Sequence, residues 1–288
     1  MGIVVALTAA LFWAISARFY GHSAAQWSVF LLNFAKNLSA VALLALALWL
    51  LPMRLTADWQ TVLILVLSGV IGIGIGDTAL FAALRRMGEQ NTLLIAETLA
   101  PLLVVMLGFV LLAEELHWLH GVGIFLVLLA TDLAIGWRRS KSINKAAVGF
   151  AVVAAACQAT GALLSRYYLS TTELGVLESA VWRLLGGLLF VSAVLVVMMM
   201  RRQTIRYQPL TLRQGSKLFV AILLGTVLGV FMLQWSLDLL RAGVAQTLLA
   251  SSPLFAVIVA WFNRDAVTAK QWLAVVIGVV GVAAISLA

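Results

Sequence analysis

Ten long apolar stretches run through the sequence and constrain its fold more than any other feature. They cover residues 2–20, 27–51, 59–84, 90–113, 117–136, 146–169, 175–200, 216–240, 243–262 and 267–287. A helix needs about 20 apolar residues to cross the hydrocarbon core of a bilayer, so each stretch has the length of one span. The sequence therefore predicts an all-α integral membrane protein with ten transmembrane helices, here called spans 1 to 10.

The composition excludes the other broad classes of protein. Hydrophobic residues make up 64% of the 288 residues and charged residues only 10%, whereas a soluble domain carries about a quarter charged residues. The chain is too rich in Leu, Val, Ile and Phe to be disordered. Its single cysteine, Cys157, cannot form an intramolecular disulfide, and the first stretch lacks a cleavage site, so we interpret it as a retained span.

The two halves of the sequence resemble each other. Matching residues recur in the same order at offsets of 147 to 155: Arg18 with Arg166, Lys36 with Arg183, Gly72 and Gly76 with Gly225 and Gly229, Gly88 with Gly243, and Pro101 with Pro253. This indicates two copies of a five-helix unit, residues 1–140 and 146–288. Because each unit has an odd number of helices, the second enters the membrane from the opposite side. The repeats are therefore inverted, as in many secondary transporters.

The basic residues predict the orientation of the chain. Of the 19 Lys and Arg residues, fourteen lie in loops after odd-numbered spans and three in loops after even-numbered spans. Cytoplasmic loops are the ones rich in Lys and Arg, so both termini are expected outside. The net charge of +8 is then a property of these loops, and we expect no nucleic-acid partner.

Three ionisable residues lie inside spans at a common depth. Lys36 in span 2, Asp77 in span 3 and Glu97 in span 4 are each eight or nine residues from the same surface, which is about 11–14 Å. Ionisable groups inside a membrane are costly, so they are candidates for function. They could form a buried network or a proton-coupling site; the alternative is a structural Lys–carboxylate pair that fixes helix packing.

Span 4 carries further polar residues around a proline. Asn91 and Thr98 share one helical face, and Gln90 and Glu97 share another. Pro101 removes the usual partner of the Glu97 carbonyl and is expected to kink the helix there. We favour a ligand cavity over a packing kink satisfied by Ser and Thr. Span 9 repeats the pattern with uncharged polar residues, Gln246 and Ser251, before its proline, Pro253.

Spans 7 and 8 supply the remaining candidates for substrate binding. Arg183 is expected to have its partner on another helix or to face a polar cavity. Gln234 is a second candidate, and Trp235 could form a cavity wall, with packing or lipid contact equally open. Asp238 is expected to pair with its neighbour Arg241. The glycines between Gly69 and Gly76 are interpreted as close helix contacts, since no strand precedes them as in a nucleotide loop.

The sequence gives little support for metal binding or for catalysis. Glu114, His117 and His120 could share a face, but the His-Glu-x-x-His order of zinc proteases is absent, so no metal is expected. There is also no Gly-x-Ser-x-Gly elbow and no Walker loop, so we expect no cofactor and no enzyme. Asp132 is interpreted as an interfacial ion-pair partner of Arg138 and Arg139.

The whole chain resembles the EamA-like family of the drug/metabolite transporter superfamily. The resemblance rests on ten spans in two copies, the Trp13 and Arg18 spacing, the basic residues Lys36 and Arg183, the prolines Pro101 and Pro253, and the acids Glu114, Glu115 and Asp265 after the proline helices. It implies an inverted-repeat carrier whose central cavity is lined mainly by spans 1, 3, 4, 6, 8 and 9. Family members typically move small metabolites and often export amino acids.

We therefore expect a secondary transporter, an exporter of amino acids or related amphipathic metabolites, in a bacterial inner membrane. A proton on Glu97 or Asp77 would couple to the substrate, and Lys36 or Arg183 would neutralise a substrate carboxylate or the acids. The partners would be a small molecule, the lipid bilayer and a proton, and the chain would be a monomer or a homodimer. An intramembrane enzyme acting on lipid and a non-transporting scaffold are the alternatives.

Overall fold

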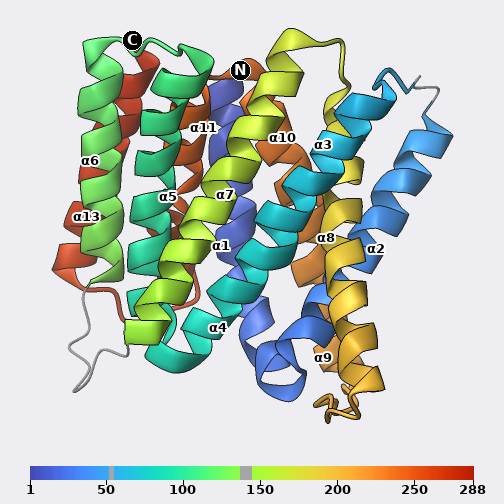
Figure 1. The fold of residues 1–288 in the computed structure, drawn as a ribbon. Coiled ribbons are helices and arrows are strands. Elements are labelled where there is room, and N and C mark those ends of the chain that lie inside the picture. The colour runs from blue at the N-terminus through green and yellow to red at the C-terminus, as the bar shows by residue number, and fades with distance from the viewer. Residues whose placement is uncertain (52–54, 137–144) are drawn as a thin grey trace.

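The computed structural model describes residues 1–51, 55–136 and 145–288, and within these ranges the chain folds into helices joined by short turns (Figure 1). Ten of the resulting segments are long and apolar enough to cross a membrane, which confirms the ten predicted spans. The elements are α1 (Gly2–Gln26), α2 (Val29–Leu50), α3 (Trp59–Gly69), η1 (Val70–Gly76), α4 (Asp77–Met87), α5 (Glu89–Leu112), α6 (Trp118–Ile135), α7 (Lys145–Thr171), α8 (Val176–Met200), α9 (Leu212–Ala221), η2 (Ile222–Leu228), α10 (Gly229–Leu239), α11 (Ala242–Leu249), α12 (Ser252–Phe262) and α13 (Ala269–Ser286).

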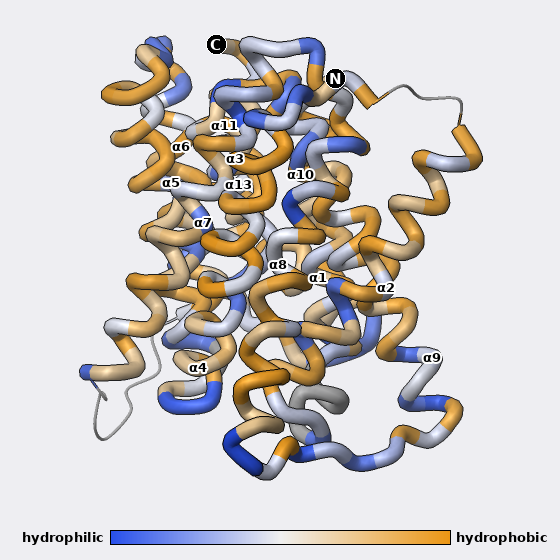
Figure 2. Tube along the Cα trace, turned by 45° about the vertical axis from the view of Figure 1, so that its right-hand side comes forward, coloured by the Kyte–Doolittle hydropathy of each residue, from blue (hydrophilic) through white to orange (hydrophobic). Residues whose placement is uncertain are grey.

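Three of the ten spans are composite. Span 3 consists of α3, η1 and α4, and span 8 consists of α9, η2 and α10; η1 and η2 are short π-helical segments at corresponding places in the two repeats. Span 9 is interrupted between α11 and α12, and Pro253 lies in the first turn of α12. In Figure 2, apolar residues dominate the outer helices, and many of the most hydrophilic segments lie at the two ends of the bundle.

The two five-helix repeats are inverted and interlock. Both termini lie at the same end of the molecule (Figure 1), and α1 runs away from that end whereas α7, the first helix of the second repeat, runs toward it. The first helix of each repeat packs on the third span of the other: α1 on η2 and α10, and α7 on η1 and α4. Likewise α2 packs on α8, and α6 on α13. These reciprocal contacts are what a two-fold relation between the repeats requires.

Glycines allow the backbones of spans 3 and 7 to come into direct contact. The close contact predicted for the glycines of span 3 is thus present, although the sequence did not identify span 7 as the partner. A Cβ added at Gly69 would lie 1.8 Å from the carbonyl oxygen of Arg183, and one at Gly186 would lie 2.0 Å from that of Val66. Small residues at such sites let membrane helices approach closely, and dispersion contacts then hold them together. The position of Arg183 thus depends on this backbone contact.

We expect Gly186→Ala to destabilise the protein strongly, because its new methyl group would meet the backbone of α3. Overpacking costs about 1–3 kcal/mol, and a backbone atom has little room to move. The matched control is Gly149→Ala in α7, where an added Cβ meets nothing within 4 Å. Thermal unfolding in detergent should show a lower melting temperature for Gly186→Ala alone. Equal melting temperatures for the two variants would contradict this account of the contact.

Candidate functional site

A cavity of about 550 Å³ lies between the two repeats. Its wall is formed by α1, α2, η1, α4, α5 and α6 from the first repeat and by α7, α8, η2, α10, α12 and α13 from the second. This volume is in the range of about 300–1,000 Å³ that is typical of small-molecule sites. Both π-helical segments contribute to the wall, and π-bulges are frequent at functional sites.

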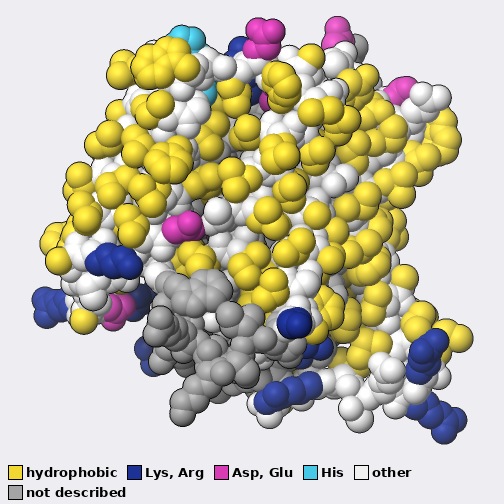
Figure 3. Space-filling view, turned by 60° about the vertical axis from the view of Figure 1, so that its left-hand side comes forward, with side chains coloured by type: hydrophobic (Ala, Val, Ile, Leu, Met, Phe, Trp, Pro, Cys, Tyr) yellow, Lys and Arg dark blue, Asp and Glu magenta, His cyan; other side chains and the backbone are white. Residues whose placement is uncertain are grey.

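The cavity extends from the middle of the membrane to the face opposite the termini. Gly72 and Arg183 lie well inside their spans, whereas Gln90 and Ala266 are exposed lining residues at the far face. None of the described lining residues lies in a loop at the termini side. Figure 3 shows that Lys and Arg side chains gather mainly at the face toward which the cavity extends.

Lys36 and Asp77 form an ion pair in the cavity wall. Lys36 Nζ donates a hydrogen bond to Asp77 Oδ2, which joins α2 to the start of α4. Both side chains are largely shielded, at 12% and 27% exposure, and the ammonium also lies over the Phe81 ring at 5.7 Å from its centroid. The Lys–carboxylate pair that the sequence left open as an alternative to a proton-coupling site is therefore present.

Glu97 lines the same cavity but is not part of this pair. It projects from α5 on the same face as Gln90 and Leu93, and its carboxyl group has no hydrogen-bond or ion-pair partner in the described part of the chain. The other face of α5 points elsewhere, since Thr98 Oγ1 donates to Asp132 Oδ1 of α6 at 2.5 Å. The partners predicted for Asp132, Arg138 and Arg139, lie outside the described residues.

Arg183 lies deep in the cavity wall, with only 4% of its surface exposed. Its Nη1 donates to Gln234 Oε1 on α10 at 2.8 Å, so the predicted partner on another helix is confirmed. Gln234 Nε2 donates in turn to Ser179 Oγ at 2.5 Å and to Ser165 Oγ at 3.3 Å. Within the described residues Arg183 Nε has no partner. Gln234 itself is fully buried and is not among the lining residues. It therefore positions the Arg183 side chain without lining the cavity.

The other predicted site residues lie outside the cavity wall, except Pro253. Asn91, Gln246 and Ser251 are buried away from it, and Trp235 packs on the Phe231 ring with centroids 5.9 Å apart. Ser252 and Pro253, at the break of span 9, line the cavity instead. Pro101 is also away from it, in the buried part of α5, which continues as a helix through the proline.

Two lining residues near the π-helical segment η2 were not among the predicted site residues. Trp13 Nε1 donates to the Gly225 carbonyl oxygen at 2.9 Å, and the Thr226 hydroxyl is 3.1 Å from that of Tyr20. A π-helical turn displaces carbonyl groups from the regular α-helical ladder, so they can accept from side chains. The only sequence signal was the place of Trp13 in the family resemblance.

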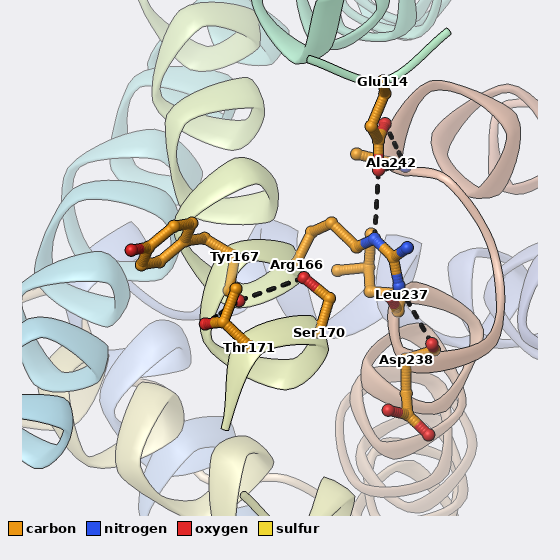
Figure 4. A network of polar contacts seen from close by, with 8 residues as sticks. All are labelled: Glu114, Arg166, Tyr167, Ser170, Thr171, Leu237, Asp238 and Ala242. Carbon is orange, nitrogen blue, oxygen red and sulfur yellow. Dashed lines mark hydrogen bonds and ion pairs between the residues drawn. The ribbon is translucent and has the colours of Figure 1, made fainter. Parts of the chain in front are cut away.

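A second polar cluster lies on the termini side of the molecule, away from the cavity residues (Figure 4). Arg166 Nε lies 3.0 Å from Glu114 Oε1, and Arg166 Nη1 donates to the carbonyl oxygens of Leu237 and Asp238 at 2.9 Å each. Glu114 Oε2 accepts from the Ala242 backbone N–H, also at 2.9 Å. Glu114 is thus an ion-pair partner, and the described residues contain no group of three metal-ligating side chains.

The predicted pairing of Asp238 with Arg241 is wrong. No ion pair joins these two side chains among the described residues. The reason is the turn between them: α10 ends at Leu239 and α11 starts at Ala242, so the two residues do not share a helical face. Arg166 instead binds the Asp238 carbonyl group.

Comparisons with known proteins agree with this architecture. The model of the EamA-like transporter family matches residues 1–135 and 145–287. An "Uncharacterized transporter" of Archaeoglobus fulgidus is 35% identical over 135 residues, which is 46% of this chain and 48% of the relative. The chain thus matches about half the length of that relative. A protein crystal structure with 18% identity superposes with a TM-score of 0.78 over 99% of this chain and 98% of that one, which shows the shared fold.

Proposed function

The chain belongs to the EamA-like transporter family, and we propose from this premise that it is a secondary transporter that exports small amphipathic metabolites such as amino acids. The observation that carries the proposal is Arg183, a buried guanidinium with an unpartnered Nε in a cavity that extends from mid-membrane to one face. Buried charges are retained inside membranes where they serve a substrate or ion pathway.

The cavity wall matches a small substrate with one anionic end. From the cavity wall, the Arg183 guanidinium would bind a substrate carboxylate, because guanidinium groups bind carboxylates with strong, directional hydrogen bonds. Leu80, Leu93 and Val230 supply apolar wall for an amphipathic body. Glu97, which has no partner in the described chain, would bind a substrate ammonium group or carry a coupled proton. The Lys36–Asp77 pair is neutral overall, so it leaves the net charge of the cavity to Arg183 and Glu97.

The distribution of basic residues supports the export direction of the proposal. Lys and Arg gather at the face that the cavity reaches, and cytoplasmic loops carry the excess of these residues. In this orientation both termini would be outside, and the cavity would open to the cytoplasm, as in the loading state of an exporter. The two repeats would alternate by rocking around the cavity. Lipid and the substrate are the partners that this function needs, with the chain as a monomer or a homodimer.

The experiment is a screen of amino acids and related carboxylates against the purified protein. A true substrate should raise the melting temperature in detergent, since a ligand that binds only the folded state stabilises it. The same compound should be less toxic to cells that overproduce the protein. Arg183→Met should lose the stabilisation. The proposed substrate chemistry is wrong if no carboxylate raises the melting temperature, and if amines or neutral compounds raise it equally in the parent protein and in Arg183→Met.

A further inference from the structure

Two ion pairs at opposite ends of the molecule are related by the repeat. Arg166 of α7 pairs with Glu114 in the loop after span 4, and Arg18 of α1 pairs with Asp265 in the loop after span 9, with Nη1 to Oδ2 at 2.7 Å. In each case the first helix of one repeat is joined to the loop that follows the fourth span of the other repeat. The offsets of 148 between the two arginines and 151 between the two acids lie within the range of 147 to 155 that relates the repeats.

The two pairs have different surroundings. The Arg166 and Glu114 side chains are 18% and 12% exposed, and they lie at the closed end. The Arg18 and Asp265 side chains are 42% and 50% exposed, and their chain neighbours Ala17 and Ala266 line the cavity. The exposed pair therefore flanks the open end, and the buried pair lies at the opposite, closed end.

The buried pair also holds two helix ends together (Figure 4). Arg166 donates to carbonyl groups in the last turn of α10, and Glu114 accepts from the first N–H of α11. A cation at a helix C-terminus and an anion at a helix N-terminus both match the helix dipole. Access from the termini side therefore requires these contacts to separate.

We propose that the two ion pairs are the gates of the transport cycle. The Arg166–Glu114 pair seals the termini side through its contacts with the ends of α10 and α11 in the conformation described here. The Arg18–Asp265 pair, which is already formed beside the open end, seals the other side by making the corresponding helix-end contacts when the cavity opens toward the termini. The reason is the inverted repeat: when the repeats exchange conformations, residues related by the repeat exchange surroundings. By this relation, Arg18 then binds carbonyl groups at the C-terminus of α4, and Asp265 caps the start of α5. The inference rests on the proposed function.

Accessibility of single cysteines tests the gates without knowledge of the substrate. In a Cys157→Ala background, Ser236→Cys places a thiol beside the Arg166 contacts, at a position that is buried now, and Ala260→Cys places one in the open cavity. A membrane-impermeant maleimide is applied from the termini side for the first and from the opposite side for the second. Glu114→Gln should raise labelling at position 236 and lower it at 260, each by about fivefold, because it shifts the population toward the other conformation.

Asp265→Asn should produce the opposite changes, and Glu115→Gln is the matched control in the same loop. Glu115 is exposed and makes no ion pair in the described structure, so its variant should label as the parent does. If Glu114→Gln does not fold, Arg18→Gln provides a second variant of the exposed pair. It should change the labelling in the same directions as Asp265→Asn. Reciprocal changes support the gates. Changes in the same direction at both positions, or labelling equal to that of Glu115→Gln, would overturn them.

The labelling experiment tests the proposed gates independently of the proposed substrate. Reciprocal labelling in a protein that moves none of the screened carboxylates would leave the gates standing and reject the substrate chemistry. Carboxylate transport by a protein whose labelling is unaffected by Glu114→Gln and Arg18→Gln would reject the gates alone.

Discussion

Replacing Arg183 with methionine is expected to lower the transport rate at subsaturating substrate by about thirtyfold or more. Truncating one partner of a buried, hydrogen-bonded charge pair costs about 2–5 kcal/mol, and each 1.4 kcal/mol is about a tenfold change. The substrate carboxylate would lose its cation, and the change should appear chiefly as a higher KM. Initial rates in proteoliposomes measure this effect.

Two variants control for loss of structure in that experiment. Arg183→Lys keeps the charge and one donor but not the planar guanidinium, so it should give an intermediate loss. Arg86→Met removes an exposed arginine of α4 that lies over the Phe150 ring and is not among the cavity residues; it should transport normally. If Arg183→Met stays within about threefold of the parent, this arginine does not bind substrate.

Replacing Glu97 with glutamine is expected to abolish the effect of a pH gradient on transport. The Glu97 carboxyl lies in the cavity wall without a partner in the described chain, so it can take up a proton on one side and release it on the other as the repeats alternate. Glutamine has a similar shape but does not titrate. The variant should still exchange substrate across the membrane, whereas accumulation driven by an imposed pH gradient should disappear.

The measurement is substrate movement between about pH 6 and pH 8, a range around physiological pH, with and without a gradient. Glu115→Gln again serves as the control, because it removes a carboxyl group outside the cavity. If Glu97→Gln transports as the parent does across this pH range, Glu97 does not couple protons.

The spans and one cavity contact could be predicted because both follow from regular geometry. Apolar length specifies each span, and the rise of a helix places Lys36 and Asp77 at one depth, where they indeed pair. Helical periodicity also separated the two polar faces of span 4. It could not tell which face points into the cavity, because the rotation of a helix depends on its packing: Glu97 faces the cavity, and Thr98 faces Asp132.

Features that depend on the tertiary fold were missed. Arg18 and Asp265 were identified only as separate landmarks of the repeat, since 247 residues separate them and only the packed repeats bring them together. The π-helical segments η1 and η2 have no sequence signal beyond their glycines. Proximity in sequence misled the interpretation of Asp238 and Arg241, because a turn separates their helices.

Counterflow in proteoliposomes tests the central claim most directly. Vesicles loaded with unlabelled ligand from the screen are diluted into a trace of the labelled compound. A carrier that exposes one cavity to each side in turn accumulates the label transiently above its external concentration, and we predict this for the parent protein and its loss in Arg183→Met. Label that never exceeds the external concentration, or accumulation that is unchanged in Arg183→Met, would contradict the account.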